Sequence, residues 1–409
     1  MIRVCCTVGT WQLVTLAAAL QQIGEDLSEA SGGPDEVFED YLVVYETSGV
    51  PDAFKETLQQ MAEAIWPWKR IIWAYDLLTS NRNISQRQFD DLRQTLRERV
   101  GVPPEQVDEV WVCWLTRPAE KLVFETYPTA RIQLFEDGLI SYIPVPLSKR
   151  LKNDEEPPNL FYALRARLRN RLDSVWSVRR YRRGRRQMDP RHLRRIGSAY
   201  LQLTPDLPPP ETLADIPRRF VDYRCLGEAL DRVKPILPWA DVTEAAECSG
   251  TPDRLLVLGQ ALSRNGIMSR SEEFGIYRDV VDAILAKGYS ILWKEHPRIS
   301  TPFFADLKVY ARSRFPDADE RLRQLSIPHA FPVELVADRL CLAGCAAGSS
   351  AALFYLKRLY GIPCYTFGAA LAPRMKGFDL SMNDIIRRDV PPLDDLPSLL
   401  PAVAERSGQ

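Results

Sequence analysis

Short apolar runs recur along the first third of the chain, and stretches with helical spacing separate them. After residue 10, Leu13, Leu16, Leu20 and Ile23 fall three or four positions apart, which is the spacing of one helical face. The apolar runs have the length of buried strands. They lie at residues 3–8, 40–46, 70–75, 109–115 and 130–135. Apolar strands that alternate with amphipathic helices predict a parallel sheet covered by helices on both faces.

The same alternation returns in the last third of the chain. Strands are predicted at 254–259, 289–294, 340–345 and 363–367, and helices at 277–287 and 349–360. A proline-dense connector at 204–211 and a break at 248–252 separate the two parts. We therefore expect an α/β protein of two Rossmann-like domains that face a central cleft, residues 1–248 and residues 249–409.

The composition is that of a soluble globular chain, because 45% of the 409 residues are hydrophobic and 26% are charged. No run approaches the roughly 18 apolar residues that a membrane-spanning helix needs. The start, MIRVCCTVG, lacks the apolar segment of a signal peptide. We therefore expect a cytoplasmic protein whose eight cysteines form no disulfide. Cys341 and Cys345 lack a second Cys or His pair, so no metal site is expected.

A strongly basic segment covers residues 149–195, which hold 16 Lys or Arg and 5 Asp or Glu, although the whole chain has a net charge of −1. Three interpretations stay open. The segment attracts an anionic acceptor chain, or it docks on the anionic inner leaflet of the membrane, or it is a solvated connector. No recognised nucleic-acid motif accompanies the charge, so a nucleic acid is not expected as a partner.

An acidic motif, Glu136-Asp137-Gly138, follows the strand predicted at 130–135. Parallel sheets bind ligands at the carboxyl ends of their strands. A carboxylate there can act as general base on an acceptor hydroxyl. Taken alone, the motif is more typical of a simple turn, because Asp-Gly is a common turn pair.

A second polar motif ends the strand predicted at 289–294. Lys294, His296, Pro297 and Arg298 lie in the sequence KEHPR. Pro297 restricts the conformation of the residue before it. A histidine between two cationic residues is suited to meet a phosphate and to donate a proton to it as it leaves. An ordinary exit from a strand is the alternative.

Two further motifs predict a nucleotide site. Gly348, Ser349 and Ser350 lie between a predicted strand and a predicted helix. A helix N-terminus with serines fits either a phosphate cradle or simple capping. Glu334, at the start of a short helix, is suited to accept hydrogen bonds from ribose hydroxyls, or lies at the surface near a helix dipole.

The order of these motifs resembles that of bacterial sialyltransferases, and most closely the α-2,8-polysialyltransferase family of GT-B glycosyltransferases. The likeness extends to residues 255–263, which include Gly259 and Gln260, and to residues 291–298 and 348–354. Residues 7–13, with Gly9 and Thr10, are similar to the first strand-to-helix loop of that family. The resemblance covers most of the chain but not clearly the basic segment.

The resemblance implies an inverting transfer of sialic acid from a CMP-activated donor to a glycan hydroxyl in capsule or cell-surface polysaccharide synthesis. It implies no metal and no cofactor besides the donor. Glu136 or Asp137 is then the base, His296 assists departure of the CMP phosphate, and Ser349 and Ser350 bind that phosphate. Glu334 holds the ribose. Gly259, Gln260, Lys294, Pro297, Arg298 and Gly348 complete the donor side, and Gly9, Thr10 and Gly138 belong to the N-terminal domain.

One residue departs from the expected pattern, and two alternatives to the function stay open. Glu295 stands where a neutral residue, often Pro, is expected before the histidine. A carboxylate there raises the pKa of His296 if it turns inward, and has no effect if it points to solvent. CMP-Kdo or another CMP-nonulosonate is an alternative donor, and a non-catalytic scaffold of a capsule assembly complex is an alternative of another class. The acceptor and the linkage are left open.

Overall fold

The computed structural model describes residues 1–31, 38–45, 52–77, 86–113, 118–138, 141, 190–202, 215–237, 253–296, 299, 301–327, 331–375 and 378–398. The chain divides into two compact units, Met1–Arg232 and Val233–Gln409. The domain boundary predicted between residues 248 and 249 falls within 238–252, outside the described residues. Residues 149–189 of the basic segment also lie outside them.

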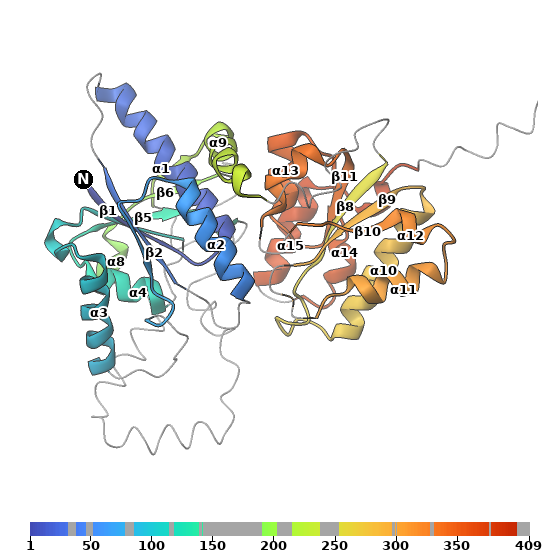
Figure 1. Ribbon diagram of the computed structural model, residues 1–409, viewed down its shortest axis with the longest axis horizontal. Coiled ribbons are helices and arrows are strands. Elements are labelled where there is room, and N and C mark those ends of the chain that lie inside the picture. The colour runs from blue at the N-terminus through green and yellow to red at the C-terminus, as the bar shows by residue number, and fades with distance from the viewer. Residues whose placement is uncertain are drawn as a thin grey trace, which may run out of the picture. The chain divides into compact units, whose positions relative to one another are not determined.

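In the described part of the N-terminal unit, seven parallel strands form one sheet in the order β3-β2-β1-β4-β5-β6-β7. Figure 1 labels β1, β2, β5 and β6 of this sheet. The strands are β1 Ile2–Thr7, β2 Glu39–Val44, β3 Arg70–Trp73, β4 Glu109–Val112, β5 Arg131–Phe135, β6 Ile196–Leu201 and β7 Arg218–Phe220. Nearly every residue of β1, β2, β4 and β5 is buried, as expected for strands covered on both faces.

The helices of this unit cover the sheet from two sides. They are α1 Thr10–Ser31, α2 Asp52–Ile65, α3 Gln86–Val100, α4 Pro118–Thr126, α8 Pro190–Leu193 and α9 Tyr223–Val233, with the 3₁₀ turn η1 Pro104–Gln106. Helix α1 packs against α2, and α3 packs against α4. Because parallel crossovers are right-handed, connections that run in opposite directions along the sheet put their helices on opposite faces.

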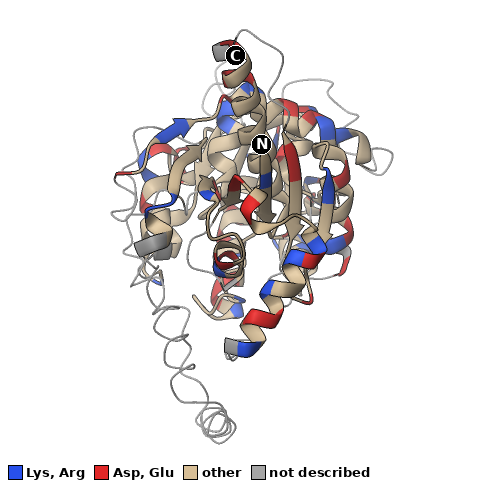
Figure 2. Ribbon diagram, turned by 90° about the vertical axis from the view of Figure 1, so that its left-hand side faces the viewer, with Lys and Arg blue, Asp and Glu red and all other residues tan. Residues whose placement is uncertain are grey.

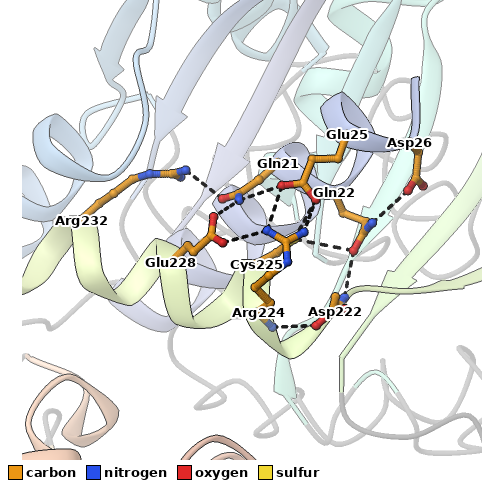
Figure 3. A network of polar contacts seen from close by, with 9 residues as sticks. All are labelled: Gln21, Gln22, Glu25, Asp26, Asp222, Arg224, Cys225, Glu228 and Arg232. Atoms are coloured by element: carbon orange, nitrogen blue, oxygen red, sulfur yellow. Dashed lines mark hydrogen bonds and ion pairs between the residues drawn. The ribbon is translucent and has the colours of Figure 1, made fainter. Parts of the chain in front are cut away.

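A polar network fastens α9 to α1 within this unit (Figure 3). The Arg224 guanidinium donates to Glu25 on α1 at 3.1 Å and to Glu228 on α9 at 2.7 Å. The backbone N–H of Asp222 donates to the side chain of Gln22 at 3.0 Å. Such exposed pairs stabilise weakly one by one, but together they fix α9, which ends where the second unit begins.

The described residues of the C-terminal unit form a second parallel sheet, in the order β10-β9-β8-β11-β12. Its strands are β8 Arg254–Leu258, β9 Ser290–Lys294, β10 Leu322–Gln324, β11 Leu342–Ala347 and β12 Cys364–Thr366. The helices are α10 Arg270–Ala286, α11 Phe304–Arg312, α12 Ala318–Arg321, α13 Ala352–Tyr360, α14 Gly368–Leu371 and α15 Phe378–Asp389. The 3₁₀ turns are η4 Lys234–Ile236, η7 Val333–Leu335, η8 Ala337–Arg339 and η9 Leu393–Asp395.

Both sheets reverse their strand order beside their first strand, between β1 and β4 and between β8 and β11. Loops at the carboxyl ends of strands diverge at such a switch point and leave room for a ligand. The predicted α/β fold with two parallel sheets is thus confirmed. The pattern did not predict β6, β7 and β10, of which β7 and β10 have only three residues each. Helix α10 begins seven residues before the predicted start, because Ser269 and Glu272 form a capping box.

One expectation about the cysteines is wrong. Cys5, Cys6, Cys113, Cys225, Cys345 and Cys364 are free thiols. Cys341, in contrast, is disulfide-bonded. The cysteines therefore no longer support a reducing compartment, and the cytoplasmic location stays a prediction.

The charges of the described residues form no simple pattern. Basic and acidic residues are interspersed along the same helices and strands (Figure 2). Arg195, at the end of the basic segment, donates to the backbone carbonyls of Phe124, Tyr127 and Ala130 at 2.6–3.1 Å, so this arginine fixes the chain around α4. Within the described residues, no helix combines the length and apolar character that a membrane crossing requires.

Candidate active site

Glu136 is held inside the N-terminal unit. It directly follows β5 and its side chain is fully buried. Its Oε2 accepts a hydrogen bond of 2.6 Å from the backbone N–H of Gln202, which follows β6. Its carbonyl accepts one of 2.8 Å from the Thr15 hydroxyl on α1. The first carboxylate of the acidic motif therefore joins β5, β6 and α1.

Asp137 is half-buried and is oriented by α1. Its Oδ1 accepts a hydrogen bond of 2.5 Å from the Gln12 amide, and its N–H donates to the Ser141 hydroxyl at 2.9 Å. Gly138 follows with a φ of 58°, a left-handed conformation that disfavours residues with a Cβ. The turn therefore exists, as Asp-Gly predicts, and it holds a carboxylate at the carboxyl end of β5.

The start of α1 supplies the partner of that carboxylate. Gly9 lies between β1 and α1, and Thr10 is the first residue of α1. The Gly9 carbonyl accepts from the Leu13 N–H at 3.1 Å. A Cβ on Gly9 would lie 2.1 Å from the Gln12 amide oxygen. Gly9 therefore leaves the space in which Gln12 reaches Asp137. Gln12 itself was not singled out by the sequence, although it lies in the first turn of a helix after a parallel strand.

In the C-terminal unit, hydrogen bonds to α10 hold the loop after β8 in place. The N–H of Gln260 donates to the Tyr277 hydroxyl at 2.6 Å, and that hydroxyl donates to Glu273 at 2.8 Å. Glu273, which is fully buried, also accepts from the N–H of Ser263 at 2.8 Å. Glu273 and Tyr277 lie within the apolar pattern of α10, so these hydrogen bonds could not be predicted from the sequence.

The loop after β11 lies beside the loop after β8. The N–H of Ser349 donates to the Gln260 side chain at 3.3 Å, which joins the two loops across the switch point. The Ser350 hydroxyl accepts a hydrogen bond of 3.3 Å from the N–H of Ala352, which is the first residue of α13. Gly348 is required by packing, because a Cβ there would lie 2.4 Å from the Leu371 side chain.

The end of β9 is joined to the loop after β8. The N–H of Gly259 donates to the Lys294 carbonyl at 2.9 Å, so the ends of β8 and β9 are joined. His296 is half-buried, and its carbonyl accepts from the N–H of Ile299 at 3.0 Å. Glu295 turns inward to the backbone of Phe303 and Phe304. Pro297 and Arg298 lie outside the described residues.

Two buried ionisable residues, Lys294 at the end of β9 and Glu334 on η7, interact electrostatically. Lys294 and Glu334 are both buried. Burial lowers the pKa of Lys294 to about 8, although the charge of Glu334 opposes this. Burial raises the pKa of Glu334 to about 7, although its own backbone N–H and then Lys294 oppose this. The Glu334 carbonyl accepts from the Tyr360 hydroxyl at 2.6 Å, which ties η7 to α13. Tyr360 is the last residue of α13, so this bond places η7 beside the C-terminal end of that helix, whereas Ser349 and Ser350 precede its first residue.

The structure therefore gathers each set of predicted residues within its own unit. Hydrogen bonds join the loops after β8, β9 and β11, and the charge of Glu334 on η7 acts on Lys294 at the end of β9. In the N-terminal unit, Gly9, Thr10, Asp137 and Gly138 lie at the carboxyl ends of β1 and β5, whereas Glu136 is turned into the interior. Both sets lie where parallel α/β sheets bind ligands.

Comparisons with known proteins concern the fold and the family of the chain. No protein among the curated sequences matches the chain. Among solved structures, TcCGT1 in complex with UDP has a TM-score of 0.50 at 11% identity and covers 97% of this chain and 86% of its own. Apo UGT2 of Phytolacca americana has a TM-score of 0.49 at 12% identity, covering 95% and 84%. The alpha/beta-galactoside alpha-2,3-sialyltransferase of Photobacterium phosphoreum has 0.44 at 12%, covering 97% and 99%.

At these identities the structural likeness concerns the fold alone, which is the GT-B fold of glycosyltransferases. The sequence decides the family. The family model "Alpha-2,8-polysialyltransferase (POLYST)" matches residues 8–369, which is most of the chain. The chain is therefore a glycosyltransferase that belongs to the alpha-2,8-polysialyltransferase family.

Proposed function

We propose that this glycosyltransferase moves sialic acid from CMP-sialic acid to a hydroxyl of a glycan acceptor, with inversion at the anomeric carbon and without a metal ion. The observation that carries the proposal is the convergence of Gln260, His296 and Ser349 at the carboxyl ends of three parallel strands. Membership of a family named for α-2,8-polysialyl transfer supports sialic acid as the transferred sugar.

The proposed reaction moves one sugar and one proton. The acceptor oxygen bonds to the anomeric carbon as the bond from that carbon to the phosphate oxygen breaks. The acceptor proton passes to the Asp137 carboxylate, and CMP leaves. Attack from the face opposite the phosphate inverts the configuration. We assign the base to Asp137 because it is half-buried, whereas Glu136 is fully buried and bonded to Gln202.

The departing phosphate gains negative charge, so donors that are fixed in advance stabilise the transition state more than the ground state. His296 is the donor that we assign to the leaving oxygen. The Ser350 hydroxyl accepts from Ala352 and keeps its own hydrogen for a phosphate oxygen. Ser349 lies next to it, at the N-terminus of α13, where the helix dipole favours an anion. Glu334 is assigned to the ribose, with Lys294 as its counter-charge.

The donor is tested by incubating the purified protein with CMP-sialic acid and with CMP-Kdo, with an oligosialic acid as acceptor, and measuring CMP release. We expect release from CMP-sialic acid and its loss in His296→Ala, with CMP binding and the melting temperature retained. Release from CMP-Kdo alone would establish the alternative donor. CMP binding without turnover of either donor would favour the scaffold of a capsule assembly complex.

The proposal requires Asp137 and His296 to act on the same donor and acceptor. A variant at either position should therefore abolish transfer, but only His296→Ala should also abolish hydrolysis of the donor by water. The product that we propose is a sialic acid chain of a capsule or another cell-surface polysaccharide. Such a chain is a polyanion, which the basic segment at 149–195 suits.

A further inference from the structure

We propose that Glu295 is a positioning residue that ties the end of β9 to the start of α11 and so holds His296 in place for the donor phosphate. The proposal rests on the function proposed above for His296. It concerns the position at which the chain departs from the pattern expected before this histidine.

The Glu295 carboxylate lies in the interior of the C-terminal unit and accepts hydrogen bonds there. Its side chain is buried, with 2% of the residue exposed. Its Oε1 accepts from the N–H of Phe303 at 2.6 Å and from that of Phe304 at 2.8 Å. These amides lie at the N-terminus of α11, where no partner exists within the helix, and Phe303 supplies no side-chain cap. A negative charge there is also favoured by the helix dipole. Glu295 therefore closes an eight-residue stretch that begins with His296.

Both ends of this stretch are anchored independently of its middle. At one end, the Lys294 carbonyl accepts from Gly259 at 2.9 Å. At the other, Arg270 donates to the carbonyls of Thr301 and Pro302 at 2.8 and 3.1 Å, and its guanidinium lies 4.1 Å from the centre of the Phe303 ring. Glu295 lies between the anchored Lys294 and His296, so the hydrogen bonds of the Glu295 side chain help to decide where the His296 backbone lies.

A positioning role and a role in proton transfer make different demands on the Glu295 side chain. Burial raises the pKa of Glu295, and the N–H groups of Phe304 and Phe303 act against that rise. Both hydrogen bonds to those N–H groups end on one oxygen. An amide carbonyl of the same length can accept them, whereas a carboxylate one methylene shorter cannot reach them from the same backbone position. Length therefore matters more than charge if Glu295 positions His296.

The test compares Glu295→Gln, which keeps the length, with Glu295→Asp, which keeps the charge. For Glu295→Gln we expect kcat for CMP release from CMP-sialic acid within about threefold of the parent and an unchanged pH profile. For Glu295→Asp we expect kcat to fall about 10- to 100-fold with little change in KM, because a catalytic group such as His296 that is displaced by about 1 Å loses a rate factor of this size. Amide hydrogen exchange at Phe303 and Phe304 should accelerate in Glu295→Asp but not in Glu295→Gln.

A matched control separates position from stability. Arg321→Ala removes hydrogen bonds of 2.6 and 2.8 Å to the carbonyls of Leu285 and Tyr289, near the other end of β9. It should lower the melting temperature and leave kcat unchanged. A Glu295→Gln variant as slow as Glu295→Asp, or with a shifted pH profile, would overturn the positioning role. So would full activity of Glu295→Asp while His296→Ala is inactive. Full activity of His296→Ala would instead refute the proposed function, and this inference with it.

Discussion

Replacing each carboxylate of the acidic motif by its amide tests whether one of them is the base. Asp137 is half-buried and accepts from Gln12 at 2.5 Å. In Asp137→Asn the amide oxygen can still accept this hydrogen bond, so the fold should be retained. A general base contributes about 10² to 10⁴ in rate. We therefore expect kcat to fall by this factor, which corresponds to about 3–5 kcal/mol in the activation free energy.

Glu136→Gln should change stability instead. The Glu136 carboxylate is fully buried and accepts from the Gln202 N–H at 2.6 Å. Weakening a hydrogen bond to a charged group costs about 1–3 kcal/mol in the free energy of unfolding. For a unit of this size, each kcal/mol corresponds to about 2–4 °C in melting temperature. We expect a lower melting temperature and a kcat within about threefold of the parent.

The assay is CMP release from CMP-sialic acid at saturating donor and acceptor, with CMP affinity and thermal unfolding measured on the same samples. CMP binding serves as the control, since both residues belong to the N-terminal unit, whereas the proposed donor residues belong to the C-terminal unit. The assignment is refuted if Glu136→Gln loses activity at full stability while Asp137→Asn keeps it, because the two residues would then exchange roles. If both variants keep their activity, the motif is only a turn.

Three further predictions concern other parts of the chain. Because the pKa of Glu334 is raised from 4.5 to about 7, the folded protein binds more protons than the unfolded chain between these pH values. Its stability should therefore fall as the pH rises from about 4.5 to about 7, and Glu334→Gln should flatten that slope in thermal unfolding measured against pH. Gly348→Ala should lower the free energy of unfolding, measured with denaturant, by about 1–3 kcal/mol, because the added Cβ meets Leu371. Gly275→Ala, inside α10, should raise the free energy of unfolding slightly. In the basic segment, glutamine is substituted for Arg179, Arg180, Arg182 and Arg183. This variant should bind anionic liposomes or oligosialic acid more weakly, and its binding should depend less on salt. An unchanged salt dependence would exclude docking by this segment.

The positions of the site loops follow from the sequence. A parallel strand that is buried on both faces is mostly apolar, and polar residues become frequent again where it ends. The carboxyl ends of parallel strands meet at one edge of their sheet. The acidic motif after β5, the histidine after β9 and the serines after β11 therefore had to lie at carboxyl edges, and the structure places them there.

Which side chain of a motif faces inward was decided only by the tertiary structure. Glu136 and Asp137 are adjacent and chemically alike, but the partner that buries Glu136 is Gln202, 66 positions away, and the partner that orients Asp137 is Gln12, 125 positions away. Glu295 likewise turns inward because the first amides of α11 need an acceptor. Local spacing carries no information about such long-range partners, because they meet only when the sheet and its helices have assembled.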